Sequence, residues 1–305
     1  MDTGFIQGII PAAITPMTED EVLDEGGVER LLDHLIDQGV HGIFTGGTAG
    51  ESWALTVEEK QKLYRWTVKY TNGRVPVYVG TAANTTREAV LLAECAQEAG
   101  ADCLSVLTPY FITPNEEETF AHYGAIAGAV DLPVLLYDLP DRTGNRLSVD
   151  LVMRLAGAFE NIVGIKDSSG DFTQTLEYLR RAPEGFRVIM GRDTLIYAAL
   201  AHGAAGAIAA SGNVAPELGV AIYESYARGD LKAALDFQQR LSPLRQAFAL
   251  GTHPAMLKAG AELVGLPGGP PRRPVRRLSE ADRRKLQEVL VEIGCLKEGV
   301  VGRIP

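Results

Sequence analysis

The stretch ENIVGIKDSSGD, residues 160–171, places a single lysine, Lys166, at the end of a short apolar run. Ile162, Val163 and Ile165 predict a buried strand, because short apolar runs bounded by Gly-bearing segments are typical of covered strands. A lysine at that position is partly removed from water, and desolvation disfavours its charged form. We therefore expect a free amine that can attack a carbonyl. The alternative is that the stem of Lys166 packs while its charge reaches solvent.

This strand is one of eight apolar runs that alternate with amphipathic segments. The predicted strands span residues 8–16, 42–46, 75–82, 102–109, 132–140, 161–168, 186–191 and 203–211. The predicted helices span residues 26–39, 57–70, 85–99, 115–129, 148–158, 171–181, 193–202 and 215–228. Eight such units indicate a closed (β/α)8 barrel with a parallel sheet. An open, doubly wound sheet is the alternative, but the first strand and helix lack the GxGxxG motif expected there.

The remainder of the chain predicts a helical appendage and not a second catalytic domain. Three helices are expected, over Leu231–Leu250, His253–Leu263 and Ser279–Ile293. The stretch PGGPPRRP (267–274) separates the last two, because proline and glycine interrupt helices. The predicted fold is therefore an α/β TIM barrel over residues 1–229, which carries the catalytic site, followed by a C-terminal helical domain over residues 230–305.

Composition and charge exclude several classes of protein. Of the 305 residues, 46% are hydrophobic and 22% are charged, which is typical of a folded globular chain. The net charge of −10 disfavours nucleic-acid binding, and the arginine cluster at 272–277 in the Pro-rich connector is expected to be a solvated loop. No apolar run is long enough for a membrane helix, and the N-terminus does not resemble a signal peptide. We therefore expect a cytoplasmic protein without membrane partners.

Cysteines and histidines give no sign of a metal centre. Cys95, Cys103 and Cys295 form no CxxC pair, and the five histidines show no metal-ligand spacing. Neither a disulfide framework nor a metal site is expected.

Polar residues follow the predicted strands at the ends where barrel enzymes carry their catalytic groups. If Tyr137 faces the barrel mouth, its phenol can shuttle protons; the alternative is a buried tyrosine with a satisfied hydroxyl. Gly47 and Gly50 permit a turn whose backbone N–H groups converge on a carboxylate, although many such loops are only turns. Arg142 can hold a second carboxylate through its planar guanidinium, or it is a surface arginine on a loop.

These residues resemble the pyruvate-dependent class I aldolases typified by dihydrodipicolinate synthase and N-acetylneuraminate lyase. The resemblance covers residues 5 to about 265 and rests on five motifs in order. They are GTAGES (47–52), TPYF (108–111), YDLPDRTG (137–144), GIKDSSGD (164–171) and SGNVAPE (211–217). The resemblance implies a TIM barrel with a C-terminal helical domain, assembled as a homotetramer from two tight dimers. It also implies small-molecule substrates and neither a metal nor an organic cofactor.

By this resemblance, Lys166 forms a Schiff base with pyruvate or with the 2-oxo end of a cleavable substrate. Tyr137 is then the general acid and base, and the hydroxyl of Thr48 passes protons to it. The substrate-binding residues that the resemblance implies are Thr48 and Ala49 through their backbone amides, Arg142 for the carboxylate of the aldehyde, and Gly191 and Ile208 as pocket lining.

Three features depart from the synthase pattern. Ala49 replaces a second threonine, and because that contact is largely through backbone, pyruvate binding is expected to survive. Phe111 replaces a tyrosine that the neighbouring subunit lends to a three-hydroxyl proton relay, so that relay is in doubt. The KDSSGD segment after Ile165 is similar to the sugar-acid aldolases and lyases, whereas Arg142 is similar to the synthases.

The sequence leaves several functions open. The main hypothesis is an aldolase that makes or cleaves a C–C bond between pyruvate and an aldehyde, with a 2-oxo-3-deoxy sugar acid or aspartate semialdehyde as the substrate. A dehydratase of a 2-oxo-3-deoxy sugar acid is an alternative. A non-catalytic barrel that binds a small acid is another, but it has no need for Lys166 and Tyr137 together. The sequence does not decide the direction of the reaction or whether lysine regulates the enzyme. It also does not decide whether the protein forms a tetramer or only a dimer.

Overall fold

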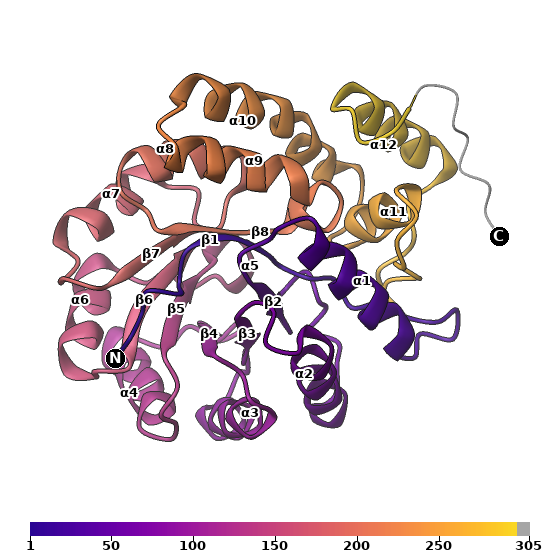
Figure 1. The fold of residues 1–305 in the computed structure, drawn as a ribbon. Helices are drawn as coiled ribbons and strands as arrows, with labels where there is room; N and C mark the ends of the chain where they lie inside the picture. Colours follow the sequence, from indigo (N-terminus) through magenta and orange to yellow (C-terminus); the bar gives the residue numbers. More distant parts are fainter. Residues whose placement is uncertain (298–305) are drawn as a thin grey trace.

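The computed structural model describes residues 1–297 and contains one eight-stranded parallel sheet (Figure 1). Its strands are β1 (Gly8–Pro11), β2 (Ile43–Thr45), β3 (Val77–Gly80), β4 (Cys103–Leu107), β5 (Val134–Asp138), β6 (Ile162–Asp167), β7 (Arg187–Met190) and β8 (Gly206–Ala209). Their order is β1-β8-β7-β6-β5-β4-β3-β2. Ala12 bridges to Phe44 in parallel, and the amide of Ala13 donates to the carbonyl of Phe44 at 2.8 Å. The two edges therefore meet, and the predicted barrel is confirmed.

Helices follow the strands and cover the outside of the barrel. They are α1 (Glu25–Asp37), α2 (Val57–Thr71), α3 (Thr86–Ala99), α4 (Glu116–Ala127), α5 (Pro140–Thr143), α6 (Val149–Ala158), α7 (Phe172–Arg181), α8 (Ile196–Ala201) and α9 (Pro216–Ala227), with short 3-10 turns η1 (Asp193–Leu195) and η2 (Ala210–Asn213). The predicted helices all occur, but α5 was not expected. The prediction of a strand over residues 8–16 is too long, because the continuous strand ends at Pro11 and only the isolated pairing of Ala12 and Ala13 with Phe44 follows it.

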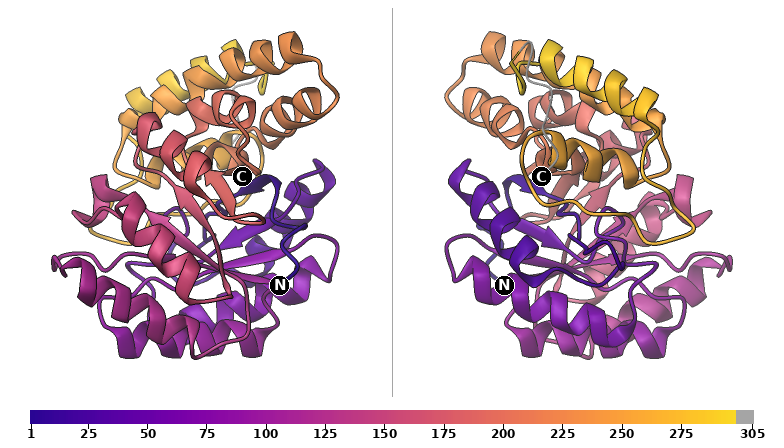
Figure 2. Two further views of the ribbon diagram at one scale, coloured as in Figure 1. Left: turned by 90° about the vertical axis from the view of Figure 1, so that its left-hand side faces the viewer. Right: turned by 90° about the vertical axis from the view of Figure 1, so that its right-hand side faces the viewer.

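The C-terminal region is helical, as predicted. It contains α10 (Leu231–Gln246), η3 (Ala247–Leu250), α11 (Ala255–Leu263) and α12 (Glu280–Glu292). Figure 2 shows these helices, orange to yellow, together on the side of the barrel that carries α8 and α9. Residues 298–305, the end of the predicted helical domain, lie outside the described residues. Within residues 1–297, no helix has both the length and the apolar character to cross a membrane.

The prediction that residues 272–277 form a solvated loop is wrong for Arg272. Its guanidinium donates to the carboxylate of Glu59 at 2.6 and 2.8 Å, and to the carbonyls of Ala54 and Glu21 at 3.0 and 2.7 Å. Only 17% of the Arg272 side chain is exposed. Arg272 therefore ties the C-terminal region to the segments that flank the first two barrel units.

A buried ion pair joins the loop after β2 to α11. Lys258 Nζ lies 2.6 Å from Glu51 Oε1, and it donates to the carbonyl of Pro270 at 2.8 Å. The amide of Arg272 donates to Glu51 Oε2 at 2.7 Å. The exposed fractions of the Lys258 and Glu51 side chains are 1% and 0%. Because Glu51 directly follows Gly50, this pair fixes the end of the Gly-rich turn to the C-terminal region.

Replacing Lys258 by methionine should lower the free energy of unfolding by about 3–5 kcal/mol, because the buried carboxylate of Glu51 loses its partner. Urea denaturation measures the change. The matched control is Lys285→Met, which removes an exposed ion pair with Asp282 and should cost less than about 1 kcal/mol. Equal losses in the two variants would contradict a stabilising role for the buried pair.

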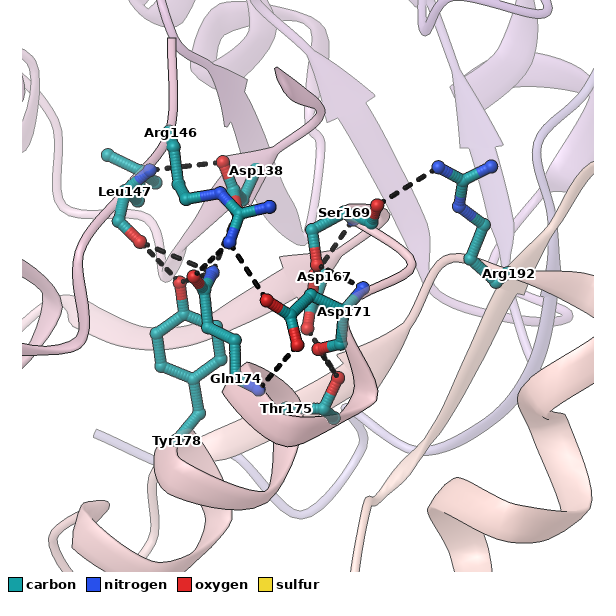
Figure 3. A network of polar contacts seen from close by, with 10 residues as sticks. All are labelled: Asp138, Arg146, Leu147, Asp167, Ser169, Asp171, Gln174, Thr175, Tyr178 and Arg192. Carbon is teal, nitrogen blue, oxygen red and sulfur yellow. Dashed lines mark hydrogen bonds and ion pairs between the residues drawn. The ribbon is translucent and has the colours of Figure 1, made fainter. Parts of the chain in front are cut away.

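The strand register sets the side chains at the ends of β5 and β6. Tyr137 pairs with Lys166, and Asp138 pairs with Asp167. Successive side chains point to opposite faces of a strand, so the two aspartates lie on the other face from Tyr137 and Lys166. Figure 3 shows both aspartates inside a network of polar contacts. Carboxylates are thus kept away from the amine of Lys166.

The network satisfies both buried aspartates. Asp138 accepts from the amide of Leu147 at 3.1 Å and from Gln174 Nε2 at 3.0 Å. Asp167 accepts from the hydroxyl of Thr175 at 2.6 Å (Figure 3). Burial raises the pKa of Asp138 to about 7; the hydrogen bond from Leu147 opposes this shift, and the charge of Asp167 adds to it.

The raised pKa of Asp138 makes stability depend on pH. In the unfolded chain an aspartate has a pKa of about 3.9, so the folded state binds this proton more tightly. The stabilising contribution of this proton is complete below about pH 4 and is lost as the pH rises to about 7. Above that pH, Asp138 causes no further change in the free energy of unfolding. The loss amounts to about 4 kcal/mol at most.

The variant Asp138→Asn has no proton to lose at this position. Its free energy of unfolding, measured with urea from pH 4 to 7, should therefore fall less with rising pH than that of the wild type. The control Asp150→Asn, at an exposed position, should keep the wild-type slope. A wild-type slope in Asp138→Asn would show that Asp138 does not titrate in this range.

Candidate functional site

The barrel mouth contains a cavity of about 430 Å³ at the C-terminal ends of the strands. Every residue that the sequence predicted for the site lines it: Thr48, Ala49, Tyr137, Arg142, Lys166, Gly191 and Ile208. The structure thus brings these residues together at one cavity, and their roles stay predictions. Phe111 lies elsewhere, on the loop after β4, with 95% of its surface exposed.

Lys166 is buried at the end of β6, with an exposed fraction of 3%. Its Nζ lies 3.9 Å from the ring centre of Tyr137 and 4.4 Å from that of Phe44. Burial lowers the pKa of Lys166, while Tyr137 and the more remote Asp193 act in the opposite direction. The alternative in which the charge reaches solvent is therefore wrong. A larger uncharged fraction makes this amine a better nucleophile than an ordinary lysine.

Tyr137 faces the cavity, whereas the sequence left open which face of the strand it lies on. It lies beside Lys166 in the parallel pairing of β5 and β6, and its ring packs edge-on against Phe44 with 6.4 Å between ring centres. The residue is buried, so bulk water does not compete for its phenol. A phenol next to an amine can exchange protons with a species formed on that amine.

The Gly-rich turn after β2 presents backbone donors to the cavity. Among residues 1–297, the amides of Thr48 and Ala49 donate no hydrogen bond, and both residues line the cavity. Gly50 approaches the first strand closely: a Cβ there would lie 3.0 Å from the carbonyl of Ala13. Thr15 donates its hydroxyl proton to the Gly50 carbonyl at 2.7 Å. Two neighbouring N–H groups without a protein acceptor, on a fixed turn that lines the cavity, suit a carboxylate.

Gly191 and Ile208 shape the cavity without adding charge. Gly191 directly follows β7. A Cβ at this position would lie 1.9 Å from the hydroxyl oxygen of Ser168, so a side chain does not fit there. Ile208 is buried in β8 and contributes an apolar wall.

The sequence missed part of the lining. Arg245, Phe248 and His253 come from the C-terminal region, which was expected to be an appendage only, whereas Arg192 follows β7 at a strand end where site residues were expected. Arg192 pairs with Asp141 and donates to the carbonyl of Ser168 at 2.8 Å. The sequence offered one signal for this part of the lining, a polar residue, His253, between two apolar helical segments. A single residue of this kind is weak evidence for a site.

Comparison with known proteins places the chain in a family. A model of the dihydrodipicolinate synthetase family matches residues 5–293. The chain is 39% identical over 298 residues to a 4-hydroxy-tetrahydrodipicolinate synthase of Methanopyrus kandleri, covering 97% of this chain and 99% of the relative. It is 41% identical over 293 residues to a protein of the same name from Methanoculleus marisnigri, covering 95% and 100%.

Solved structures agree with this placement. The crystal structure of YagE, a prophage protein of the dihydrodipicolinic acid synthase family from E. coli K12 in complex with pyruvate, matches with a TM-score of 0.93 at 34% identity, covering 95% of this chain and 99% of that one. Dihydrodipicolinate synthase from Thermotoga maritima matches with a TM-score of 0.92 at 32% identity, covering 95% and 99%. The chain therefore belongs to the dihydrodipicolinate synthetase family and is an enzyme of the lyase type, a class I aldolase.

Proposed function

We propose that this enzyme forms a Schiff base between Lys166 and pyruvate, and that it makes or cleaves a C–C bond between pyruvate and an aldehyde. The buried amine of Lys166, which has no acidic group within ion-pair distance among residues 1–297 and lies beside the ring of Tyr137, carries this proposal. The crystal structure of YagE with pyruvate supports the choice of 2-oxo acid. The names of the curated relatives support aspartate semialdehyde as one aldehyde, and the KDSSGD segment supports a sugar-acid fragment as another.

The proposed reaction begins with the uncharged amine of Lys166. The amine attacks C2 of pyruvate, and the carbinolamine loses its hydroxyl as water to give a protonated imine. Tyr137, with the Thr48 hydroxyl passing protons to it, moves one proton from the attacking nitrogen to the oxygen and then gives its own proton, so that the oxygen leaves as water. The imine withdraws electrons from C3, and the Tyr137 phenolate takes the C3 proton to give an enamine. The enamine carbon attacks the aldehyde carbonyl, whose oxygen takes that proton from Tyr137. Water then adds to the imine carbon, its proton returns to the Tyr137 phenolate, and the product is released with the free amine; cleavage runs in reverse.

Binding groups have separate roles in this proposal. The amides of Thr48 and Ala49 hold the pyruvate carboxylate, Arg142 binds the carboxylate of the aldehyde, and Gly191 and Ile208 line the pocket. Because the imine itself accepts the electrons, the reaction uses neither a metal nor an organic cofactor.

We also propose a cytoplasmic homotetramer built as a dimer of dimers. Phe111 and Ile112, next to each other after β4, expose large apolar surfaces that association would cover. By the family resemblance, Phe111 also replaces the tyrosine that one subunit lends to the proton relay of its neighbour. The proposed mechanism therefore does not include that relay.

Trapping with borohydride tests the Schiff base. Wild-type protein incubated with pyruvate and sodium borohydride should carry a reduced adduct on the peptide that contains Lys166, detected by mass spectrometry. The variant Lys166→Met should carry none. Lys60→Met is the matched control, because Lys60 is a buried lysine outside the cavity, and it should keep the adduct on Lys166. An adduct on another lysine, or none in the wild type, refutes the proposal.

Removing the phenol of Tyr137 tests its role in proton transfer. Tyr137→Phe should lower kcat by about 10²- to 10⁴-fold with a smaller effect on KM for pyruvate, because an acid–base group is lost and the binding turn is intact. Steady-state kinetics measure both. The control Tyr123→Phe removes a buried hydroxyl that bonds the Val106 carbonyl outside the cavity, and it should keep kcat. Equal kcat values for Tyr137→Phe and the wild type would exclude the role.

A further inference from the structure

The Gly-rich turn after β2 has the paired hydrogen bonds that end many helices. The amide of Glu51 donates to the carbonyl of Thr48 at 3.2 Å, and the amide of Ser52 donates to the carbonyl of Gly47 at 3.2 Å. In that pattern the residue with the inner donor is left-handed and is usually glycine. Here it is Glu51, with a φ of +59°. A large side chain therefore occupies a position that the backbone reserves for glycine.

These two hydrogen bonds set the direction of two further amides. The carbonyl of Gly47 shares a peptide group with the amide of Thr48, and the carbonyl of Thr48 shares one with the amide of Ala49. The C=O and N–H of a planar trans peptide point in opposite directions. The donors of residues 51 and 52 therefore direct the N–H groups of Thr48 and Ala49 away from themselves. Within residues 1–297 these N–H groups have no acceptor, and both residues line the cavity.

The left-handed conformation of Glu51 is what allows both hydrogen bonds. The amides of residues 51 and 52 lie on either side of the Cα of Glu51, so its torsion angles decide whether they reach successive carbonyls. A negative φ at this position would turn one of the amides away from its acceptor. For a residue other than glycine, a positive φ is strained, and such strain persists only where the surrounding structure imposes it.

The carboxylate of Glu51 supplies that constraint. Its Oε1 lies 2.6 Å from Lys258 Nζ, and its Oε2 accepts from the amide of Arg272 at 2.7 Å. Both partners belong to the C-terminal region, and the side chain of Glu51 is fully buried. Two contacts on separate oxygens fix the orientation of the carboxylate. A glycine at this position would adopt the same φ but would have no such attachment.

We propose that Glu51 is a positioning residue for the 2-oxo acid. Its carboxylate, held by Lys258 and by the amide of Arg272, keeps residue 51 left-handed and thereby directs the N–H groups of the turn at the carboxylate of pyruvate. The C-terminal region then sets the affinity for pyruvate without touching it. This inference rests on the proposed aldolase function, since it concerns the binding of the 2-oxo acid in that reaction.

Variants at residue 51 test the proposal in a Lys258→Met background, which leaves no buried ammonium unpaired. In Glu51→Ala/Lys258→Met, the pyruvate concentration for half-maximal borohydride trapping at Lys166 should rise by about 10- to 100-fold over the wild type, because hydrogen bonds to a charged group are weakened. A wild-type value overturns the proposal.

Two milder replacements in the same background should restore part of the affinity. Glu51→Gly adopts the left-handed conformation without strain, and Glu51→Gln keeps an acceptor for the amide of Arg272. Both half-maximal concentrations should therefore lie between those of the wild type and of the alanine variant. If the alanine variant does not fold, these two carry the comparison with the wild type, and wild-type values in both overturn the proposal.

Methyl pyruvate separates positioning from general damage to the site. The ester keeps the 2-oxo group but lacks the negative charge, and hydrogen bonds to a neutral acceptor contribute less. Its half-maximal concentration should therefore change by less than about threefold in the variants of Glu51. A parallel rise for pyruvate and for its ester would show that Lys166 itself is disturbed, which overturns the proposal.

Leu286→Ala controls for lost stability. Leu286 is buried in α12, and no residue of α12 lines the cavity. The truncation should lower the melting temperature, because it leaves a cavity in the core, and should keep the wild-type dependence on pyruvate. A loss of affinity as large as that in Glu51→Ala/Lys258→Met would assign the effect to stability and overturn the proposal.

Borohydride trapping of the wild type distinguishes failure of the proposed function from failure of this inference. Trapping at Lys166 with the same pyruvate dependence in all variants refutes only the role of Glu51. Absence of trapping in the wild type refutes the aldolase function on which that role rests.

Discussion

The structure depends on keeping one buried amine without a carboxylate partner. Among residues 1–297, three lysines are buried: Lys60, Lys166 and Lys258. Lys258 lies 2.6 Å from Glu51 and Lys60 lies 3.7 Å from Glu88, so each has a compensating charge. Within residues 1–297, Lys166 has no acidic group within ion-pair distance and meets aromatic rings instead. Burial lowers the pKa of all three lysines. At Lys60 and Lys258 a carboxylate within ion-pair distance opposes this shift, whereas at Lys166 the ammonium form has no such partner among residues 1–297.

Strand register is what maintains this separation. In β5 and β6 the active-site pair Tyr137 and Lys166 is followed at once by the pair Asp138 and Asp167. A slip of one residue would turn the aspartates into the cavity and the lysine out of it, because side chains alternate along a strand. The contacts in Figure 3 hold the aspartates outside the barrel mouth and thereby resist such a slip. The polar network behind the site thus determines its electrostatics.

The barrel could be predicted from the sequence because apolar strand runs are local patterns, and residues at the strand ends indicated Lys166, Tyr137 and Arg142. The other four predicted lining residues came only from the family resemblance: Thr48, Ala49, Gly191 and Ile208. The sequence did not predict the direction of Tyr137, since the strands of a covered barrel are apolar on both faces. Arg272 and Arg245 were missed for another reason. The partner of Arg272, Glu59, is 213 residues away in the sequence, and no local sequence pattern predicts an ion pair over that separation. Arg245 lies in an amphipathic helix, where an arginine is typical of a solvated face.

The C-terminal region is consequently part of the site and not only an appendage. Lys258 fixes the end of the turn that carries Thr48 and Ala49, while Arg245 and His253 line the cavity. The strands supply the amine and the phenol, whereas α10, η3 and the segment before α11 supply side chains that the proposed imine chemistry does not use. The electrostatic surroundings of Lys166 and the outer lining of the cavity therefore depend on different segments of one chain.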